Sequence, residues 1–206
     1  MLEHVNHVGP RRTIVQQLSE RGVSAEDIDT VLFSHAHWDH SRPISDVFPN
    51  AKAYFGPGTR AACQPGHMKD PSLQWDGRFF DPEHSTEKWD ELQGEWRPFG
   101  PFERALDYFG DGSFWVLDAP GHMPGNMAAA ARLQGGEWVM LGSDYLTSAK
   151  DTIAKIRQLE TNFGVHTALA HDASWLKQGT DQVLMSLLDS KMRVAAKEKI
   201  PFDEIP

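Results

Sequence analysis

The sequence predicts one α/β domain over residues 1–206, and three features support this fold class. Short apolar runs of strand length alternate with stretches whose apolar residues recur at helical spacing. Several of these runs end shortly before a histidine or an aspartate, as functional groups do at the carboxyl edge of an open α/β sheet. The length provides for one sizeable core and does not demand a second one.

The elements expected in the first third are a helix, a single N-capped turn, two short strands and a small helix. The first helix carries Leu18 on its apolar side and ends at Gly22, a residue suited to the left-handed conformation beyond a helix end. Gly56 and Pro57 interrupt the chain after the second strand. In chain order these elements cover residues 13–21, 24–27, 30–34, 51–55 and 59–63.

The second half predicts two β-hairpins that build a second sheet, and then a helix, a strand and a helical tail. Turns containing glycine at residues 110–112 and 134–136 separate the arms of the hairpins. Ile153, Ile156 and Leu159 recur every three residues and mark one face of the helix. The hairpins, the helix, the strand and the tail cover residues 104–117, 126–141, 152–159, 165–170 and 181–199.

Residues 64–100 are the least regular part of the sequence. A long loop inside a compact domain is usually functional, so this stretch is expected to wall or cover a pocket. Its aromatic side chains could face an apolar substrate, but packing against the body is the favoured interpretation, because buried aromatics mostly serve packing. They are Trp75, Phe79, Phe80, Trp89 and Trp96. His67 and His84 are expected to face solvent.

A metal site is predicted where residues 34–40 read Ser-His-Ala-His-Trp-Asp-His, directly after an apolar run. Imidazole nitrogen and carboxylate oxygen are ligands of zinc and of other borderline divalent cations. Alternation along an irregular loop lets neighbouring side chains converge, and four uncompensated polar groups beside a buried strand would be costly. The candidate ligands in this segment are His35, His37, Asp39 and His40.

Three further candidate ligands, His122, Asp144 and His171, each lie just beyond another apolar run. If the runs are strands, all these side chains come from strand carboxyl ends and converge on one site. His166 competes with His171 for the last position. We favour His171, because it lies at the carboxyl end of its run and is followed by Asp172, whereas His166 lies at the start.

The order of these motifs resembles the metallo-β-lactamase superfamily of binuclear hydrolases. The resemblance rests on His-x-His-x-Asp-His at residues 35–40, Pro-Gly-His at 120–122, Gly-Ser-Asp at 142–144 and His-Asp at 171–172. It implies a four-layer αββα sandwich. Residues 109–114, leading into residues 118–122, resemble a fungal lactonase/lactamase-like branch more than glyoxalase II or RNase Z.

Carried over to this sequence, the resemblance implies two divalent metal ions, with zinc as the expected metal. His35, His37 and His122 would hold one ion, Asp39, His40 and His171 the other, and Asp144 would bridge them; a carboxylate can bridge because both of its oxygens carry lone pairs. The only cysteine, Cys63, lies outside every ligand segment. This departs from lactamases that place a cysteine on the second metal, and it weakens the case for antibiotic hydrolysis.

The implied activity is hydrolysis of a cyclic ester or a cyclic amide, a lactone or a lactam, by a metal-bound hydroxide. Asp39 and Asp144 are the expected catalytic carboxylates, and Tyr145 could donate a hydrogen bond to the oxyanion, although packing under the loop is as good an interpretation. Two alternatives stay open: a thioester hydrolase of the glyoxalase II type, and a truncated metal-binding relative with little activity.

Two departures from the superfamily pattern bear on the fold. Only 34 residues precede His35, and a helical stretch follows Asp144 almost at once, where related chains carry longer segments. The first sheet is therefore expected to be incomplete. An open sheet edge with an apolar face favours self-association, so a homo-oligomer is also considered.

Composition limits the partners and the compartment. The formal net charge of −9 disfavours nucleic acid, whose binding relies on clustered lysine and arginine. No apolar run reaches the roughly 20 residues that span a bilayer, and the opening residues do not resemble a secretory signal. A lone cysteine suits a reducing compartment. We therefore expect a cytoplasmic protein that acts on a small molecule and uses neither nucleic acid nor a membrane.

Overall fold

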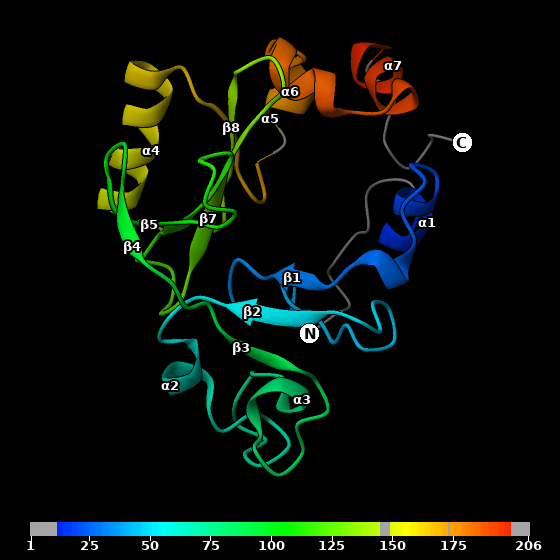
Figure 1. Ribbon diagram of the computed structural model, residues 1–206, viewed down its shortest axis with the longest axis vertical. Helices are drawn as coiled ribbons and strands as arrows, with labels where there is room; N and C mark the ends of the chain where they lie inside the picture. The colour runs from blue at the N-terminus through cyan, green and yellow to red at the C-terminus, as the bar shows by residue number, and fades with distance from the viewer. Residues whose placement is uncertain (1–11, 145–148, 173, 199–206) are drawn as a thin grey trace.

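The computed structural model of the chain describes residues 12–144, 149–172 and 174–198, and in these ranges it contains two β-sheets (Figure 1). The first sheet has three parallel strands in the order β1-β2-β3. The second has six strands in the order β4-β5-β6-β7-β8-β9. The strands are β1 (Thr30–Leu32), β2 (Lys52–Phe55), β3 (Trp89–Glu91), β4 (Trp96–Phe99), β5 (Phe102–Asp107), β6 (Phe114–Asp118), β7 (Met127–Arg132), β8 (Trp138–Leu141) and β9 (His166–Ala168).

Strands β4 to β8 form an antiparallel meander, as expected of strands joined by short turns. The two predicted hairpins are β5–β6 and β7–β8, and both lie in the second sheet as predicted. Strand β9 pairs parallel to β8, with Val139 opposite His166. A parallel neighbour needs a crossover, which helix α4 provides between these two strands.

The helical elements are short except for α4, which spans 14 residues. Helix α1 begins with a capping box in which Thr13 and Gln16 exchange side-chain and main-chain hydrogen bonds. The helices and the single 3-10 turn are α1 (Ile14–Ser19), η1 (Ala25–Asp27), α2 (Thr59–Cys63), α3 (Gly77–Phe80), α4 (Lys150–Phe163), α5 (Ser174–Gln178), α6 (Gln182–Leu187) and α7 (Ser190–Glu198). The predicted helical tail is thus two helices, separated at Leu188 and Asp189.

Three apolar clusters arrange these elements in four layers. One joins the first sheet to α1, α2 and α3 through residues such as Phe55, Phe79 and Leu18. Another joins the outer face of the second sheet to α4 through Ile156 and Leu159. The remaining one lies between the sheets. The order helices, sheet, sheet, helix is the αββα sandwich that the resemblance implied (Figure 1).

The segment 64–100 is more regular than predicted, because it contains α3, β3 and β4. These elements have only three or four residues each, too few for a periodic pattern. Phe79 and Phe80 are completely buried against Phe55, and Trp89 packs on the same cluster. Packing, the favoured interpretation, is correct for these three aromatic residues, and His67 and His84 are exposed as predicted.

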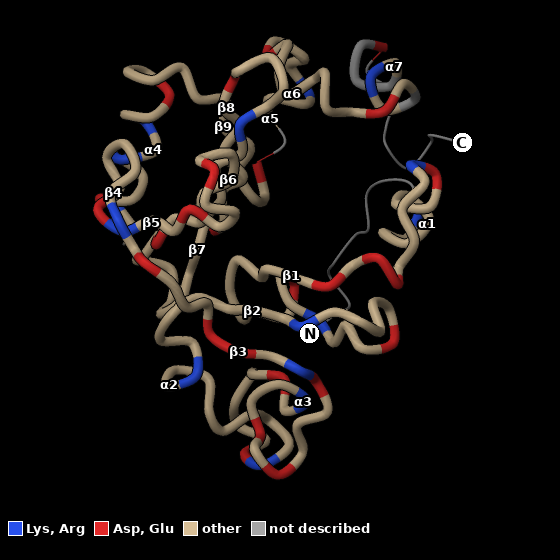
Figure 2. The backbone as a smooth tube through the Cα atoms, viewed as in Figure 1, with Lys and Arg blue, Asp and Glu red and all other residues tan. Residues whose placement is uncertain are grey.

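Charged residues of both signs are interspersed along the described backbone (Figure 2). Among these residues, no helix has the length and the apolar character that crossing a bilayer requires. The first sheet has three strands in the described ranges, and β1 forms one of its edges. The one-domain assignment and the expected self-association stay predictions.

Candidate metal centre

The predicted ligands lie beyond the carboxyl ends of four strands. Strand β1 ends three residues before His35, β6 ends at Asp118 ahead of His122, β8 ends three residues before Asp144, and β9 ends three residues before His171. The main-chain amide of Met127 donates to the carbonyl of Ser34 over 2.8 Å, which joins the ligand loop of the first sheet to the second sheet. The ligand-bearing segments therefore meet where the two sheets come together.

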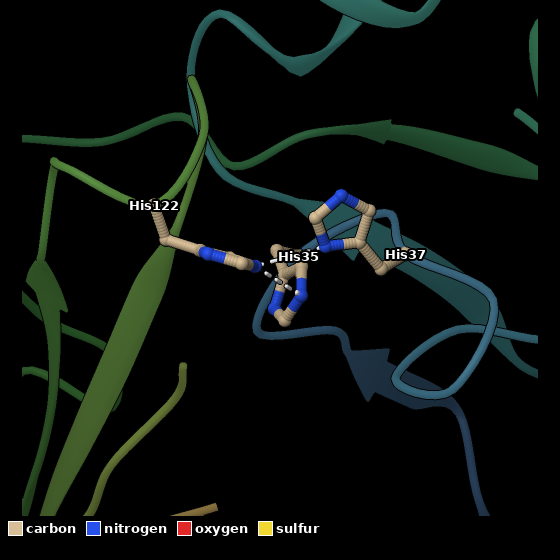
Figure 3. A group of neighbouring side chains, drawn as sticks. All are labelled: His35, His37 and His122. Carbon is tan, nitrogen blue, oxygen red and sulfur yellow. Dashed lines mark hydrogen bonds between the residues drawn. The ribbon is translucent and has the colours of Figure 1, made fainter. Parts of the chain in front are cut away.

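Three histidine side chains converge from two loops, as Figure 3 shows for His35, His37 and His122. The Nε2 atom of His122 lies 2.9 Å from Nδ1 of His37 and 3.2 Å from Nε2 of His35. Two nitrogens bound at 2.0–2.1 Å to one tetrahedral zinc lie about 3.3 Å apart. The spacing of these nitrogens is close to that of a shared tetrahedral ion.

A second group consists of Asp39, His40, Asp144 and His171, whose candidate donor atoms all lie within 4.8 Å of one another. Nε2 of His40 is 3.1 Å from Nε2 of His171, and each lies 3.3 Å from Oδ1 of Asp144. Asp39 completes the group, with its Oδ2 atom 3.4 Å from Nε2 of His171. This group is more accessible than the first, since Asp39 and His171 are exposed whereas His35 is fully buried.

Asp144 faces both groups. Its Oδ1 atom points to His40 and His171, while its Oδ2 atom lies 3.7 Å from Nε2 of His122 in the three-histidine group. Oδ1 is buried and accepts no hydrogen bond from the residues that the structure describes. Buried carboxylate oxygens normally bind a donor or a cation. The residues therefore fit a pair of divalent ions with a bridging carboxylate.

The electrostatics around His35 and His37 favour neutral imidazoles, the form that binds metals. Burial, together with the neighbouring imidazoles of His40 and His122, lowers the pKa of His35 to about 3. Burial and the neighbouring His122 also lower the pKa of His37, against the opposing effect of Asp39. Both shifts follow from the cost of placing positive charge in a crowded, partly desolvated cluster.

The loop that carries His122 is held by the start of α4. The hydroxyl of Thr152 donates to the carbonyl of Pro120 over 2.7 Å. Gly121 has a positive φ of 124°, and a Cβ atom there would lie 2.7 Å from Cα of Ala149. The Pro-Gly-His order therefore needs glycine in the middle, because a side chain would push the loop away from the helix.

His171 has a φ of 59°, in the left-handed region that non-glycine residues seldom occupy. Such a conformation is held by its surroundings and is concentrated at functional sites. Here it accompanies the placement of Nε2 within 3.3–3.4 Å of two carboxylates, those of Asp144 and Asp39. His166, the competing candidate, instead makes a 2.8 Å contact from Nδ1 to Asp181 and takes no part in the cluster.

All seven residues predicted as metal ligands are brought together. Of the three residues predicted to be catalytic, Asp39 and Asp144 lie in the cluster, and Tyr145 lies outside the described residues. Cys63 is buried in the first core, and burial raises the pKa of its thiol to about 12, so it remains protonated.

Two features of the site were missed or left open at the sequence level. The ring of Trp75 stacks on His37 with centroids 5.5 Å apart and planes inclined by 18°. Behind His35, Ser143 and Asn126 form a buried hydrogen-bonded pair. Ser143 stands next to a predicted ligand, which was a usable signal, whereas nothing in the sequence around Asn126 distinguishes it from an ordinary turn residue.

Comparison with curated proteins gives several relatives. The chain is 36% identical over 132 residues to metallo-hydrolase mfmC of Annulohypoxylon moriforme, a match that covers 63% of this chain and 34% of the relative. It is 30% identical over 138 residues to gamma-lactamase MBL2 of Gibberella moniliformis, a match that covers 64% of this chain and 55% of the relative. It also matches cytochrome P450 monooxygenase mpaDE' of Penicillium brevicompactum at 38% over 133 residues, or 61% of this chain.

The chain thus spans between about one seventh and about half of the length of these relatives. The match to the monooxygenase covers 15% of that protein. Most of the monooxygenase therefore lies outside the region that is similar to this chain. No family model matches the chain.

Two solved structures establish the fold. An N-acyl homoserine lactone hydrolase with N-hexanoyl-L-homoserine at its catalytic metal centre aligns with a TM-score of 0.55 at 15% identity, covering 80% of this chain and 64% of that one. A metallo-β-lactamase of Cronobacter sakazakii aligns with a TM-score of 0.50 at 14% identity, covering 90% and 75%. The chain therefore has the metallo-β-lactamase fold, and the proteins it resembles in sequence include a metallo-hydrolase and a gamma-lactamase.

Proposed function

We propose that the chain is a dinuclear metal-dependent hydrolase that opens a cyclic ester or a cyclic amide. The observation that carries this proposal is the carboxylate of Asp144, which faces a three-histidine group with one oxygen and a second His/Asp group with the other. Relatives whose names specify a gamma-lactamase and an N-acyl homoserine lactone hydrolase support the choice of ring opening.

In this proposal His35, His37 and His122 hold one ion, and Asp39, His40 and His171 hold the other, with Asp144 shared. Zinc is the proposed metal, because imidazole and carboxylate at this spacing suit a tetrahedral ion. When bound, two such ions would supply Lewis acidity towards the substrate carbonyl and would lower the pKa of the attacking water.

The buried and the exposed residues of the site have different proposed roles. The buried His35 fixes the inner side of the centre, while the exposed Asp39 and His171 form the side that a substrate can reach. We propose that Asp39 relays a proton to the oxygen or nitrogen that leaves the carbonyl carbon when the ring opens. Tyr145 is proposed to donate a hydrogen bond to the oxyanion.

The proposed substrate is therefore a small molecule, and the proposed compartment is the cytoplasm, on the grounds of the single buried cysteine. Nucleic acid is not proposed as a partner, because the formal net charge is −9 and basic residues are interspersed with acidic ones along the described backbone (Figure 2).

The test is a panel of ring-opening assays on the zinc-loaded protein, with a lactone, a lactam and a glutathione thioester as substrates. We expect turnover of the lactone or the lactam, and loss of that turnover in Asp144→Ala. His166→Ala is the matched control, because His166 lies outside the cluster. Full turnover by metal-free protein contradicts the proposal, and turnover confined to the thioester replaces it with the glyoxalase II type of activity.

A further inference from the structure

A buried chain of hydrogen bonds runs from His35 to the main chain of the second sheet. Nδ1 of His35 lies 3.0 Å from Oγ of Ser143, whose hydroxyl donates to Oδ1 of Asn126 over 2.7 Å. Nδ2 of Asn126 donates to the carbonyl of Ala119 over 2.7 Å. His35 is 0% exposed and both polar partners are 1% exposed, so solvent does not compete for these contacts.

The donor and the acceptor in each of these hydrogen bonds can be assigned by starting at the carbonyl of Ala119. The carbonyl of Ala119 can only accept, so the amide group of Asn126 faces it and the amide oxygen faces Ser143. Ser143 gives its hydrogen to that oxygen and presents a lone pair to His35. His35 must therefore carry its hydrogen on Nδ1, which leaves the lone pair of Nε2 free.

That free nitrogen is the one that enters the three-histidine group, since Nε2 of His35 lies 3.2 Å from Nε2 of His122. We propose that Ser143, oriented by Asn126, is a positioning residue. It holds His35 in the tautomer that can bind the metal ion of the three-histidine group, called the inner metal below. The inference rests on the proposed function, because that function supplies the metal ion to which Nε2 of His35 would bind. Outer hydrogen bonds of this kind fix ring orientation and ligand basicity in metal sites.

The same contact couples the two halves of the site. His35 comes from the loop after β1 in the first sheet, and Ser143 follows β8 in the second sheet and directly precedes Asp144. A shift of one sheet relative to the other would lengthen this contact and would also move the carboxylate of Asp144 relative to His35. Replacing Ser143 is therefore expected to weaken the binding of the inner metal.

Ser34 offers a second hydroxyl to the same ring, but its contacts are longer. Its Oγ atom lies 3.3 Å from Nδ1 of His35 and 3.4 Å from Nδ1 of His40. No amide oxygen orients this hydroxyl as Asn126 orients Ser143 among the hydrogen bonds of the described residues. The two serines thus predict different results, which makes Ser34→Ala an informative comparison.

The first experiment needs no bound metal. Nitrogen-15 NMR of histidine-labelled, metal-free protein reports which ring nitrogen of His35 carries the hydrogen. We expect Nδ1–H in the wild type and in Ser34→Ala, and a mixture of tautomers in Ser143→Ala. The opposite tautomer in the wild type, or an unchanged one in Ser143→Ala, overturns the inference.

The second experiment measures zinc affinity by competition with a chromophoric chelator. Ser143→Ala is expected to weaken one of two zinc sites by about 10- to 100-fold, the range typical of outer-shell substitutions. Ser41→Ala is the matched control: its hydroxyl is also buried and donates to the main-chain carbonyl of His37 over 3.1 Å, but it touches no imidazole. An equal loss in both variants overturns the inference.

A second variant and a comparison of zinc stoichiometries distinguish failure of the inference from failure of the proposed function. If Ser143→Ala does not fold, Ser143→Cys retains a weaker acceptor at the same atom and is expected to show a smaller shift of the tautomer and of the affinity. If the wild-type protein has the Nδ1–H tautomer but binds no zinc, the proposed function fails while the assignment of the hydrogen-bond chain stands. If it binds two zinc ions and Ser143→Ala binds them equally well, the inference alone fails.

Discussion

The indole of Trp75 stacks on the imidazole of His37, with ring centroids 5.5 Å apart and an interplanar angle of 18°. This contact brings the irregular segment between α2 and β3 against a predicted metal ligand. The carbonyl of Trp75 also accepts a hydrogen bond from the main-chain amide of His67 over 2.8 Å, which fixes the segment locally. Trp75 thus acts on the site, whereas its neighbours Phe79 and Phe80 serve the core.

Replacing Trp75 by leucine is expected to weaken zinc binding about 3- to 10-fold. The reason is the loss of a stacking contact, typically worth about 0.5–1.5 kcal/mol, that restricts the ring of His37. Chelator competition measures the change. Trp89→Leu is the control, because Trp89 packs on Phe55 and Phe80 and contacts none of the predicted ligands. Equal zinc affinity in the wild type and Trp75→Leu would assign Trp75 to packing alone.

The two predicted metal groups should respond differently to removal of one imidazole. His35→Ala removes a fully buried predicted ligand, whereas His171→Ala removes an exposed one. We expect His35→Ala to lose the inner ion and to be destabilised, and His171→Ala to keep one ion per chain with near-normal stability of the metal-free protein. Metal analysis after dialysis and thermal unfolding measure both effects. Retention of two ions by both variants would contradict the ligand assignment.

Gly125→Ala is expected to destabilise the protein more than Gly136→Ala. Both glycines have positive φ, 78° and 96°, so both variants bear the cost of about 1–2 kcal/mol for a left-handed alanine. A Cβ atom at Gly125 would in addition overlap the hydroxyl of Thr59, whereas nothing lies within 4 Å at Gly136. Overpacking typically adds about 1–3 kcal/mol. Urea unfolding of the two variants measures the difference, and equal midpoints would count against this packing of the His122 loop.

Acid should destabilise the metal-free protein between about pH 6.5 and pH 3. The pKa of His35 is lowered from 6.5 to about 3 in the folded chain by burial and by neighbouring imidazoles, and the pKa of His37 is lowered as well. In that window the unfolded chain binds more protons, so stability is present above pH 6.5 and is lost as the pH falls. Urea midpoints at a series of pH values, with a chelator present, measure the slope. His35→Asn should flatten it, and an unchanged slope in that variant would contradict the prediction.

The clustering of the seven predicted ligands could be expected from the sequence because each predicted ligand segment follows an apolar run. Residues such as His122 and Asp144 are marked by the strands β6 and β8 that precede them, and strand ends are where an α/β sheet gathers its side chains. The choice of His171 over His166 used the same rule, and His171 is the one that lies beside Asp39, His40 and Asp144. The order of layers came from the family resemblance and not from periodicity.

Other features could not be predicted for identifiable physical reasons. Strand β3 pairs with β2 across a long sequence separation and has three residues, so no local pattern marks it. The break between α6 and α7 at Leu188 interrupts a continuous apolar pattern. The hydrogen-bond chain behind His35 depends on three segments meeting in space, which residue spacing does not encode.

X-ray absorption at the zinc edge of the fully loaded protein would show whether Asp144 joins two ions. We expect nitrogen and oxygen ligands, no sulfur, and a metal–metal distance of roughly 3.5–4 Å that disappears in Asp144→Ala. A spectrum with one isolated zinc per chain, or with a sulfur ligand, would contradict it.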